Sequence, residues 1–161
     1  MKQEELDIIL ENHGKWLFNE GGDRADLSNA DLKNTNLRFA NLRLADLRGA
    51  DLSYANLRFA NLRFANLSNA DLSYANLSNV NLNWVNWQHV EGLTVICVQV
   101  DTTRKNNQIA YIKELDIWIT GCFQGTLDEL KASVEQTHGD NEKLRKRYYR
   151  VIDFILKEVA E

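Results

Sequence analysis

Apolar residues recur every five positions through the middle of the chain, from Ala25 to His89. The central residue of each unit is Leu in twelve of thirteen units and Trp87 in the last. Ala stands two residues earlier in ten units, and Asp or Asn always lies between them. Residues two apart point to the same side of an extended chain, so we expect Ala and Leu inside and Asp or Asn outside. A period of five fits neither a helix nor a continuous strand, so the chain must bend once per unit and form a coil.

The pattern A(D/N)LXX resembles the pentapeptide-repeat proteins and covers 65 of the 161 residues. The resemblance implies a right-handed, four-sided β-helix with one unit per side, whereas the period alone also allows a three-sided coil. Thirteen units then make about three coils, a column roughly 16 Å tall at the usual strand spacing. The chain has no Pro, which agrees with coils whose backbone N–H groups all pair.

The segments beside the repeat differ from it, as the terminal units of a solenoid must. Residues 1–22 place apolar side chains at helical spacing and end at Gly21 and Gly22, which predicts an N-terminal capping helix. Residues 23–91 are expected to form the β-helix, and residues 92–161 a C-terminal α+β cap module. The predicted fold class is therefore an all-β solenoid with helical caps.

Within the C-terminal module, residues 93–100, 108–112 and 115–120 predict three strands, with a turn at 102–107 between the first two. Thr126 and Glu129 fit a capping box at the start of a helix over residues 127–137. A longer helix is expected over residues 141–159. The tail from Gly121 resembles a module of pentapeptide-repeat proteins from phages and other mobile elements; it either closes the column or binds a partner.

Composition narrows the class of protein. Hydrophobic residues make up 44% and charged residues 26%, with a net charge of −4, which argues against disorder and against a dedicated nucleic-acid binder. No apolar stretch reaches the length of a membrane span, and the start of the chain is acidic, so we expect a cytoplasmic protein of a bacterium or infected cell. Cys97 and Cys122 lack metal-site spacing, and we expect them to be reduced and buried.

No catalytic constellation is present in the sequence. His13, His89 and His138 fall in three different segments, and phosphate-loop, nucleophile-elbow and calcium-repeat motifs are absent. We therefore predict no enzyme activity, no metal site and no cofactor.

Because residues twenty apart stack in a four-sided coil, the outward residues can be grouped by the side on which they lie. The sides are numbered one to four in chain order, starting with the unit that begins at Ala25. Sides one and two carry five acids and two bases, whereas sides three and four carry four bases and no acid. The candidate binding residues on the basic half are Arg38, Phe39, Arg43, Arg58, Phe59, Arg63, Phe64 and Trp84. These residues either form ladders that stabilise the coil or make a contact patch for an acidic partner.

The favoured function is a non-enzymatic scaffold that binds a protein partner, for example a phage or mobile-element regulator or inhibitor of a host protein. One alternative comes from family members that mimic duplex DNA and bind DNA gyrase, although the repeat's net charge of +1 counts against it. Such a mimic would gain length as an end-to-end homodimer. The other alternative is direct nucleic-acid binding, helped by the basic run at residues 143–150, which the acidic overall charge disfavours.

Overall fold

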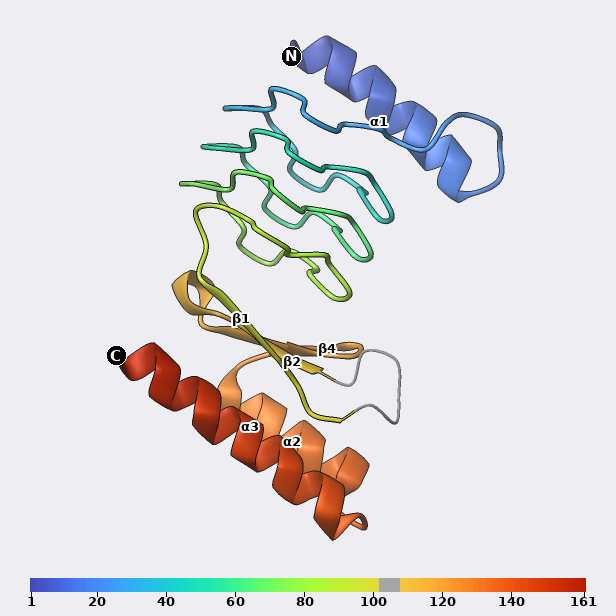
Figure 1. Cartoon of the computed structure of the whole chain (residues 1–161). Coiled ribbons are helices and arrows are strands. Elements are labelled where there is room, and N and C mark those ends of the chain that lie inside the picture. The colour runs from blue at the N-terminus through green and yellow to red at the C-terminus, as the bar shows by residue number, and fades with distance from the viewer. Residues whose placement is uncertain (102–107) are drawn as a thin grey trace. The chain divides into compact units, whose positions relative to one another are not determined.

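The computed structural model describes residues 1–101 and 108–161, and the chain divides into two compact units, residues 1–93 and residues 94–161 (Figure 1). The turn predicted over residues 102–107 lies outside the described residues.

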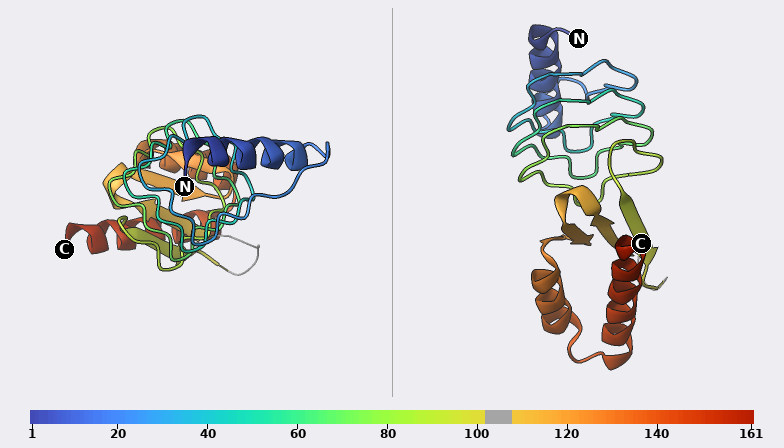
Figure 2. Two further views of the ribbon diagram at one scale, coloured as in Figure 1. Left: turned by 90° about the horizontal axis from the view of Figure 1, so that it is seen from above. Right: turned by 90° about the vertical axis from the view of Figure 1, so that its left-hand side faces the viewer.

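The first unit is a coil with a period of twenty residues, seen as stacked turns in Figures 1 and 2. Parallel bridges join the Asp or Asn of the first ten units to the residue twenty positions later, from Asp26↔Asp46 to Asp71↔Glu91. Four pentapeptides therefore make one coil, which excludes the three-sided alternative. The central Leu side chains are buried, and each contributes on the order of 1.5 to 3 kcal/mol to folding.

Each corner of the coil is a β-turn around the two residues that follow the central Leu. At the first corner the N–H of Ala30 donates to the carbonyl oxygen of Leu27 at 3.1 Å. The third residue of the turn has a positive φ, which a type II turn requires. This position takes Gly only at Gly49; elsewhere it holds Asn, His or bulky residues such as Phe59, whose φ is 60°. A non-Gly residue in this region costs about 1 kcal/mol or more, so something else must stabilise the large side chains there.

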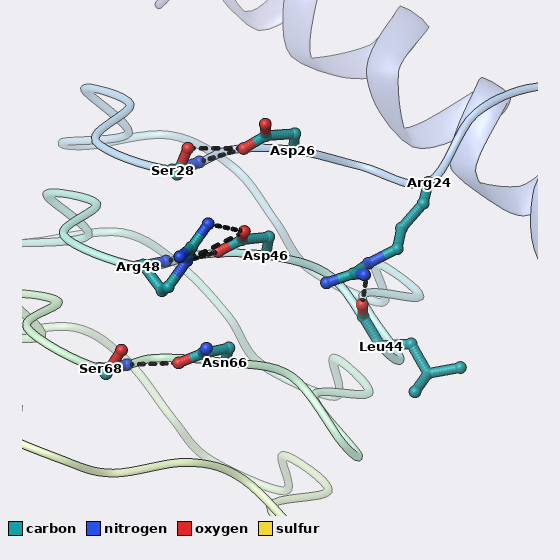
Figure 3. Close-up of polar contacts among 8 residues, drawn as sticks. All are labelled: Arg24, Asp26, Ser28, Leu44, Asp46, Arg48, Asn66 and Ser68. Carbon is teal, nitrogen blue, oxygen red and sulfur yellow. Dashed lines mark hydrogen bonds and ion pairs between the residues drawn. The ribbon is translucent and has the colours of Figure 1, made fainter.

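The Asp or Asn before each central Leu holds the turn that follows it. Its Oδ1 accepts the backbone N–H two residues later, as Asp26 does from Ser28 at 3.1 Å and Asn66 does from Ser68 at 3.1 Å (Figure 3). Asp and Asn serve equally, because only the shared Oδ1 is used. The polar position of the repeat is thus part of the turn as well as of the surface.

Helix α1 (Gln3–Leu17) covers the first coil and satisfies backbone groups that have no earlier coil to pair with (Figure 1). The side-chain amide of Gln3 accepts the N–H of Asn36 and donates to its carbonyl oxygen, both at 2.9 Å. The ring of His13 is fully buried and bridges Ala25 and Arg43. Burying these groups without partners would cost about 1 to 3 kcal/mol each, so α1 caps the column by hydrogen bonding as well as by packing.

The second unit is an antiparallel sheet with two helices. Strands β1 (Val95–Gln99), β2 (Gln108–Ile112), β3 (Ile117–Thr120) and β4 (Phe123–Gly125) pair in sequence order, and a short 3-10 helix, η1 (Lys113–Leu115), precedes β3. Helices α2 (Leu127–His138) and α3 (Glu142–Ala160) pack on one face of the sheet. Their shared core includes Ile109, Trp118 and Ile152.

The sequence predicts most of these elements to within two or three residues at each end. The capping box of Thr126 and Glu129 is present, with both hydrogen bonds made. Strand β4 is missed, because three residues are too few to show an alternating pattern. The expectation of buried thiols is wrong: Cys97 and Cys122 are both exposed residues. Partial burial of the Cys97 thiol nevertheless raises its pKa.

Candidate functional site

The predicted binding residues occupy the two corners that bound the fourth side of the coil. The N–H of Ala40 donates to the carbonyl oxygen of Leu37, and the N–H of Ala45 donates to that of Leu42. Residues 38–39 and 43–44 are therefore the central residues of two turns. One corner carries Arg38, Phe39, Arg58 and Phe59, and the other carries Arg43, Leu44, Arg63, Phe64 and Trp84. We call these corners, with Asn41, Asn61 and Asn81 between them, the fourth face.

The aromatic rings of the fourth face stack along the coil. Phe39 and Phe59 have ring centroids 5.1 Å apart and an interplanar angle of 7°, and Phe64 and Trp84 are 5.9 Å apart at 6°. Such pairs contribute about 0.5 to 1.5 kcal/mol beyond buried area, which offsets the positive φ of these positions. The ladders are therefore structural, because each of these rings has a stacked neighbour along the coil.

Arginine side chains lie over the rings that follow them in sequence. The guanidinium carbon lies 5.0 Å from the ring centroid for Arg38 on Phe39, 5.5 Å for Arg58 on Phe59 and 5.1 Å for Arg63 on Phe64. At exposed sites this contact is worth about 0.5 to 1 kcal/mol. Phe39 nevertheless remains 65% exposed. The ladder that stabilises the coil therefore also holds Arg38, Arg58 and Arg63 in place.

The opposite half of the column is acidic, and one of its carboxylates is paired with a base. Arg48 contacts the carboxylate of Asp46, with Nη2 2.6 Å from Oδ2. The hydrogen bond from Arg48 lowers the pKa of Asp46, and the hydrogen bond from Ser28 lowers the pKa of Asp26. A second aromatic ladder, Tyr54 on Tyr74 at 4.9 Å, runs up this half. The fourth face is thus the part of the coil that carries several bases and no acid.

The sequence interpretation missed two charged residues of the coil. Arg24 stands twenty residues before Leu44 and donates from Nε to its carbonyl oxygen at 2.8 Å (Figure 3), so it adds a base above the second corner. Glu91 bridges to Asp71 and extends the acidic row of the second side. Both lie just beyond the thirteen units, and carrying the twenty-residue register past the repeat would have found them.

The basic run of α3 is partly neutralised within the second unit. Arg145 lies 3.4 Å from Glu135, Lys146 lies 2.8 Å from Glu142, and Arg147 lies 3.7 Å from Asp101. These pairs leave less free positive charge for phosphate contacts than the sequence suggests.

The described residues hold no group of three or more His, Cys, Asp or Glu side chains arranged to bind a metal ion. His13 is a structural residue of the α1 cap. Within the described part of the chain, no helix has the length and apolarity needed to cross a membrane.

The family model of pentapeptide repeats matches residues 25–58 and 50–86 of the chain, with eight copies. Three solved pentapeptide-repeat proteins from cyanobacteria are similar. Rfr23 of Cyanothece 51142 is 39% identical over 38% of this chain and 42% of its own, with a TM-score of 0.37. HetL of Nostoc sp. PCC 7120, described as involved in heterocyst differentiation regulation, is 33% identical over 42% and 43%, with a TM-score of 0.31.

The third, also from Nostoc PCC 7120, is 34% identical over 52% of this chain and 72% of its own, with a TM-score of 0.30. No curated protein matches the chain, which spans less than half the length of Rfr23 and of HetL. Through its repeat the chain belongs to the pentapeptide-repeat family. Proteins of this family fold as right-handed, four-sided β-helices and are generally non-enzymatic interaction proteins.

Proposed function

We propose that this protein is a scaffold whose fourth face binds an acidic surface of a protein partner. The observation that carries the proposal is the pair of corners with four arginines and no acid, of which Arg38, Arg58 and Arg63 lie against aromatic rings. Arginine and aromatic residues dominate the energetics of protein interfaces. Arginines held by stacking also lose less side-chain freedom on binding than free ones.

The ring geometry favours a protein partner over single-stranded nucleic acid. Bases bind such surfaces by stacking on open aromatic faces, but Phe39 and Phe59 already stack on each other, as do Phe64 and Trp84. Ring edges carry partial positive charge. Together with the guanidinium groups they suit carboxylates, so acidic side chains are the chemistry that this surface would recognise.

The test is affinity capture from a bacterial lysate with the whole chain and two double variants. Arg58→Gln with Arg63→Gln removes two bases of the fourth face. The matched control is Lys33→Gln with Arg48→Gln, which removes the two bases of the acidic half and so changes the net charge by the same amount. A protein captured by the wild type and the control, and lost from the first variant, supports the proposal. Equal capture by all three chains would contradict it.

A second candidate is a DNA-mimicking modulator of DNA gyrase acting through the acidic half. The observation favouring it is the row formed by Asp31, Asp51, Asp71 and Glu91, spaced one coil apart. A gyrase supercoiling assay with the wild type and with Asp51→Asn/Asp71→Asn tests this candidate. Inhibition or protection that the variant loses would support it.

The role in phages or mobile elements is a narrower form of the first proposal. It depends on the resemblance of the tail from Gly121, and the family match ends at residue 86. Identifying the captured partner as a host regulator or enzyme would support this form.

A further inference from the structure

The arginines of the fourth face form two rows that run along the coil. Arg38 and Arg58 make one row, and Arg43 and Arg63 make the other. Residues within a row are twenty positions apart, and the backbone there pairs coil to coil, as in the hydrogen bond from Phe39 N–H to the Arg58 carbonyl oxygen at 3.0 Å. One coil rises by about 4.8 Å, so each row presents a charge at roughly that spacing.

This spacing selects the kind of backbone that can present carboxylates to it. On an α-helix, residues three or four apart rise by about 4.5 or 6 Å along the axis, which brackets the spacing of the arginine rows. On a single extended strand, residues on one face are about 6.6 Å apart. The strand spacing therefore differs from that of the arginine rows by about 1.8 Å, which is more than either helical spacing does.

The side between the two corner turns carries no charge. Asn41 lies between the turn that ends at Ala40 and the turn that begins at Leu42. The row between the corners is Asn41, Asn61 and Asn81, so no charge on the side itself opposes an acidic helix.

We propose that the fourth face binds an acidic α-helix of the partner, lying along the coil axis, with carboxylates spaced i, i+4 and i+7 against the arginine rows. The inference rests on the proposed function, since it names the element of the acidic partner that makes the contact.

The experiment measures binding of three labelled, end-blocked, alanine-based peptides to the whole chain by fluorescence anisotropy at low salt. The first places its Glu residues on one helical face at i, i+4, i+7 and i+11. The second has the same composition with Glu distributed around the helix. The third keeps the Glu positions of the first but contains two central prolines, which prevent a helix. Each is measured against the wild type, Arg58→Gln/Arg63→Gln, and the control Lys33→Gln/Arg48→Gln.

We expect the first peptide to bind about tenfold more tightly than the other two, a difference of about 1.4 kcal/mol. The fourth-face variant should lose that binding and the control should keep it, while added salt weakens it. If the first and third peptides bind equally and both lose binding to the fourth-face variant, the proposal of a helical element is wrong and the proposal of an acidic partner is retained. Binding of every peptide that is unchanged by Arg58→Gln/Arg63→Gln, or no binding at all, would overturn both.

Discussion

His13 Nε2 lies 2.9 Å from the carbonyl oxygen of Arg43, while Nδ1 of the same ring accepts the N–H of Ala25 at 3.0 Å. Because Nδ1 is an acceptor, Nε2 must carry the proton and donate to Arg43. One neutral imidazole therefore joins α1 to the beginning and to the last corner of the first coil. Protonation of Nδ1 would break the bond to Ala25.

The first prediction is that attachment of α1 weakens as the pH falls below about 6.5. Burial lowers the pKa of His13 from 6.5, so below that pH the unfolded chain binds a proton that the folded chain excludes. Stability is full above the unfolded pKa and is lost as the pH falls toward the folded pKa. The protection factors of the amides in residues 3–17, which correct for the intrinsic slowing of exchange at lower pH, should fall between about pH 7.5 and 5.5. The variant His13→Gln should exchange faster throughout and lose the extra dependence.

The second prediction concerns Gln3, whose side-chain amide pairs with the backbone of Asn36, where no earlier coil is present to do so. Gln3→Ala should cost about 1 kcal/mol, seen as faster exchange in α1 and at the amide of Asn36. Gln3→Glu keeps an acceptor for the N–H of Asn36 but places a carboxylate against its carbonyl oxygen, so it should restore only part of that loss. Full stability in Gln3→Ala would show that the hydrogen bonds between Gln3 and Asn36 do not help to hold α1.

The coil shows how much of a fold one repeat can determine. Its period, its buried Leu side chains and its polar turns follow from the sequence, because each unit repeats the same local physics. The number of units per coil does not, since a bend every five residues closes a three-sided or a four-sided path equally well. The bridge Asp26↔Asp46 decides it.

The candidate site was predictable as a set of residues but not as a surface. The twenty-residue register aligns Arg38 with Arg58 and Phe39 with Phe59. It does not show that these residues are the central residues of turns, nor that Arg63 lies over Phe64. Those facts depend on the positive φ at the corners, which no propensity suggests for Phe or Trp. The cap by Gln3 could not be predicted either. A single side-chain amide that pairs with the backbone of a distant residue leaves no pattern in the sequence.

The third prediction separates the structural role of the aromatic ladder from its binding role. Asn occupies the equivalent turn position at Asn29, Asn69 and Asn79 with φ near 60°, and Asn tolerates this conformation better than Phe. Phe59→Asn should therefore change stability by no more than about 1 kcal/mol, because relief of backbone strain offsets the lost stacking with Phe39. Partner binding should nevertheless weaken, since Arg58 loses the ring beneath it. Chemical denaturation and the capture assay test the two parts.

The fourth prediction concerns the indole of Trp84. Its Nε1 is buried and has no hydrogen-bond partner among the described residues, and such a donor costs about 1 to 3 kcal/mol. Trp84→Phe removes the donor and keeps a ring against Phe64. We expect Trp84→Phe to be at least as stable as the wild type and Trp84→Leu, which loses the stacked ring, to be less stable. If both variants are destabilised equally, the size of the indole matters more than its N–H.

The fifth prediction uses the Asn in the middle of the fourth face. Asn61 Oδ1 accepts the N–H of Arg63 at 3.0 Å, so Asn61→Ala should destabilise the coil by about 1 kcal/mol. Asn61→Asp keeps that acceptor, as Asp51 does for Ser53 at 2.9 Å, and should leave stability unchanged. The added carboxylate lies between the two arginine rows, where it would repel an acidic partner. Asn61→Asp should therefore fold normally and capture less partner, whereas full capture would mean that the partner does not lie across this side.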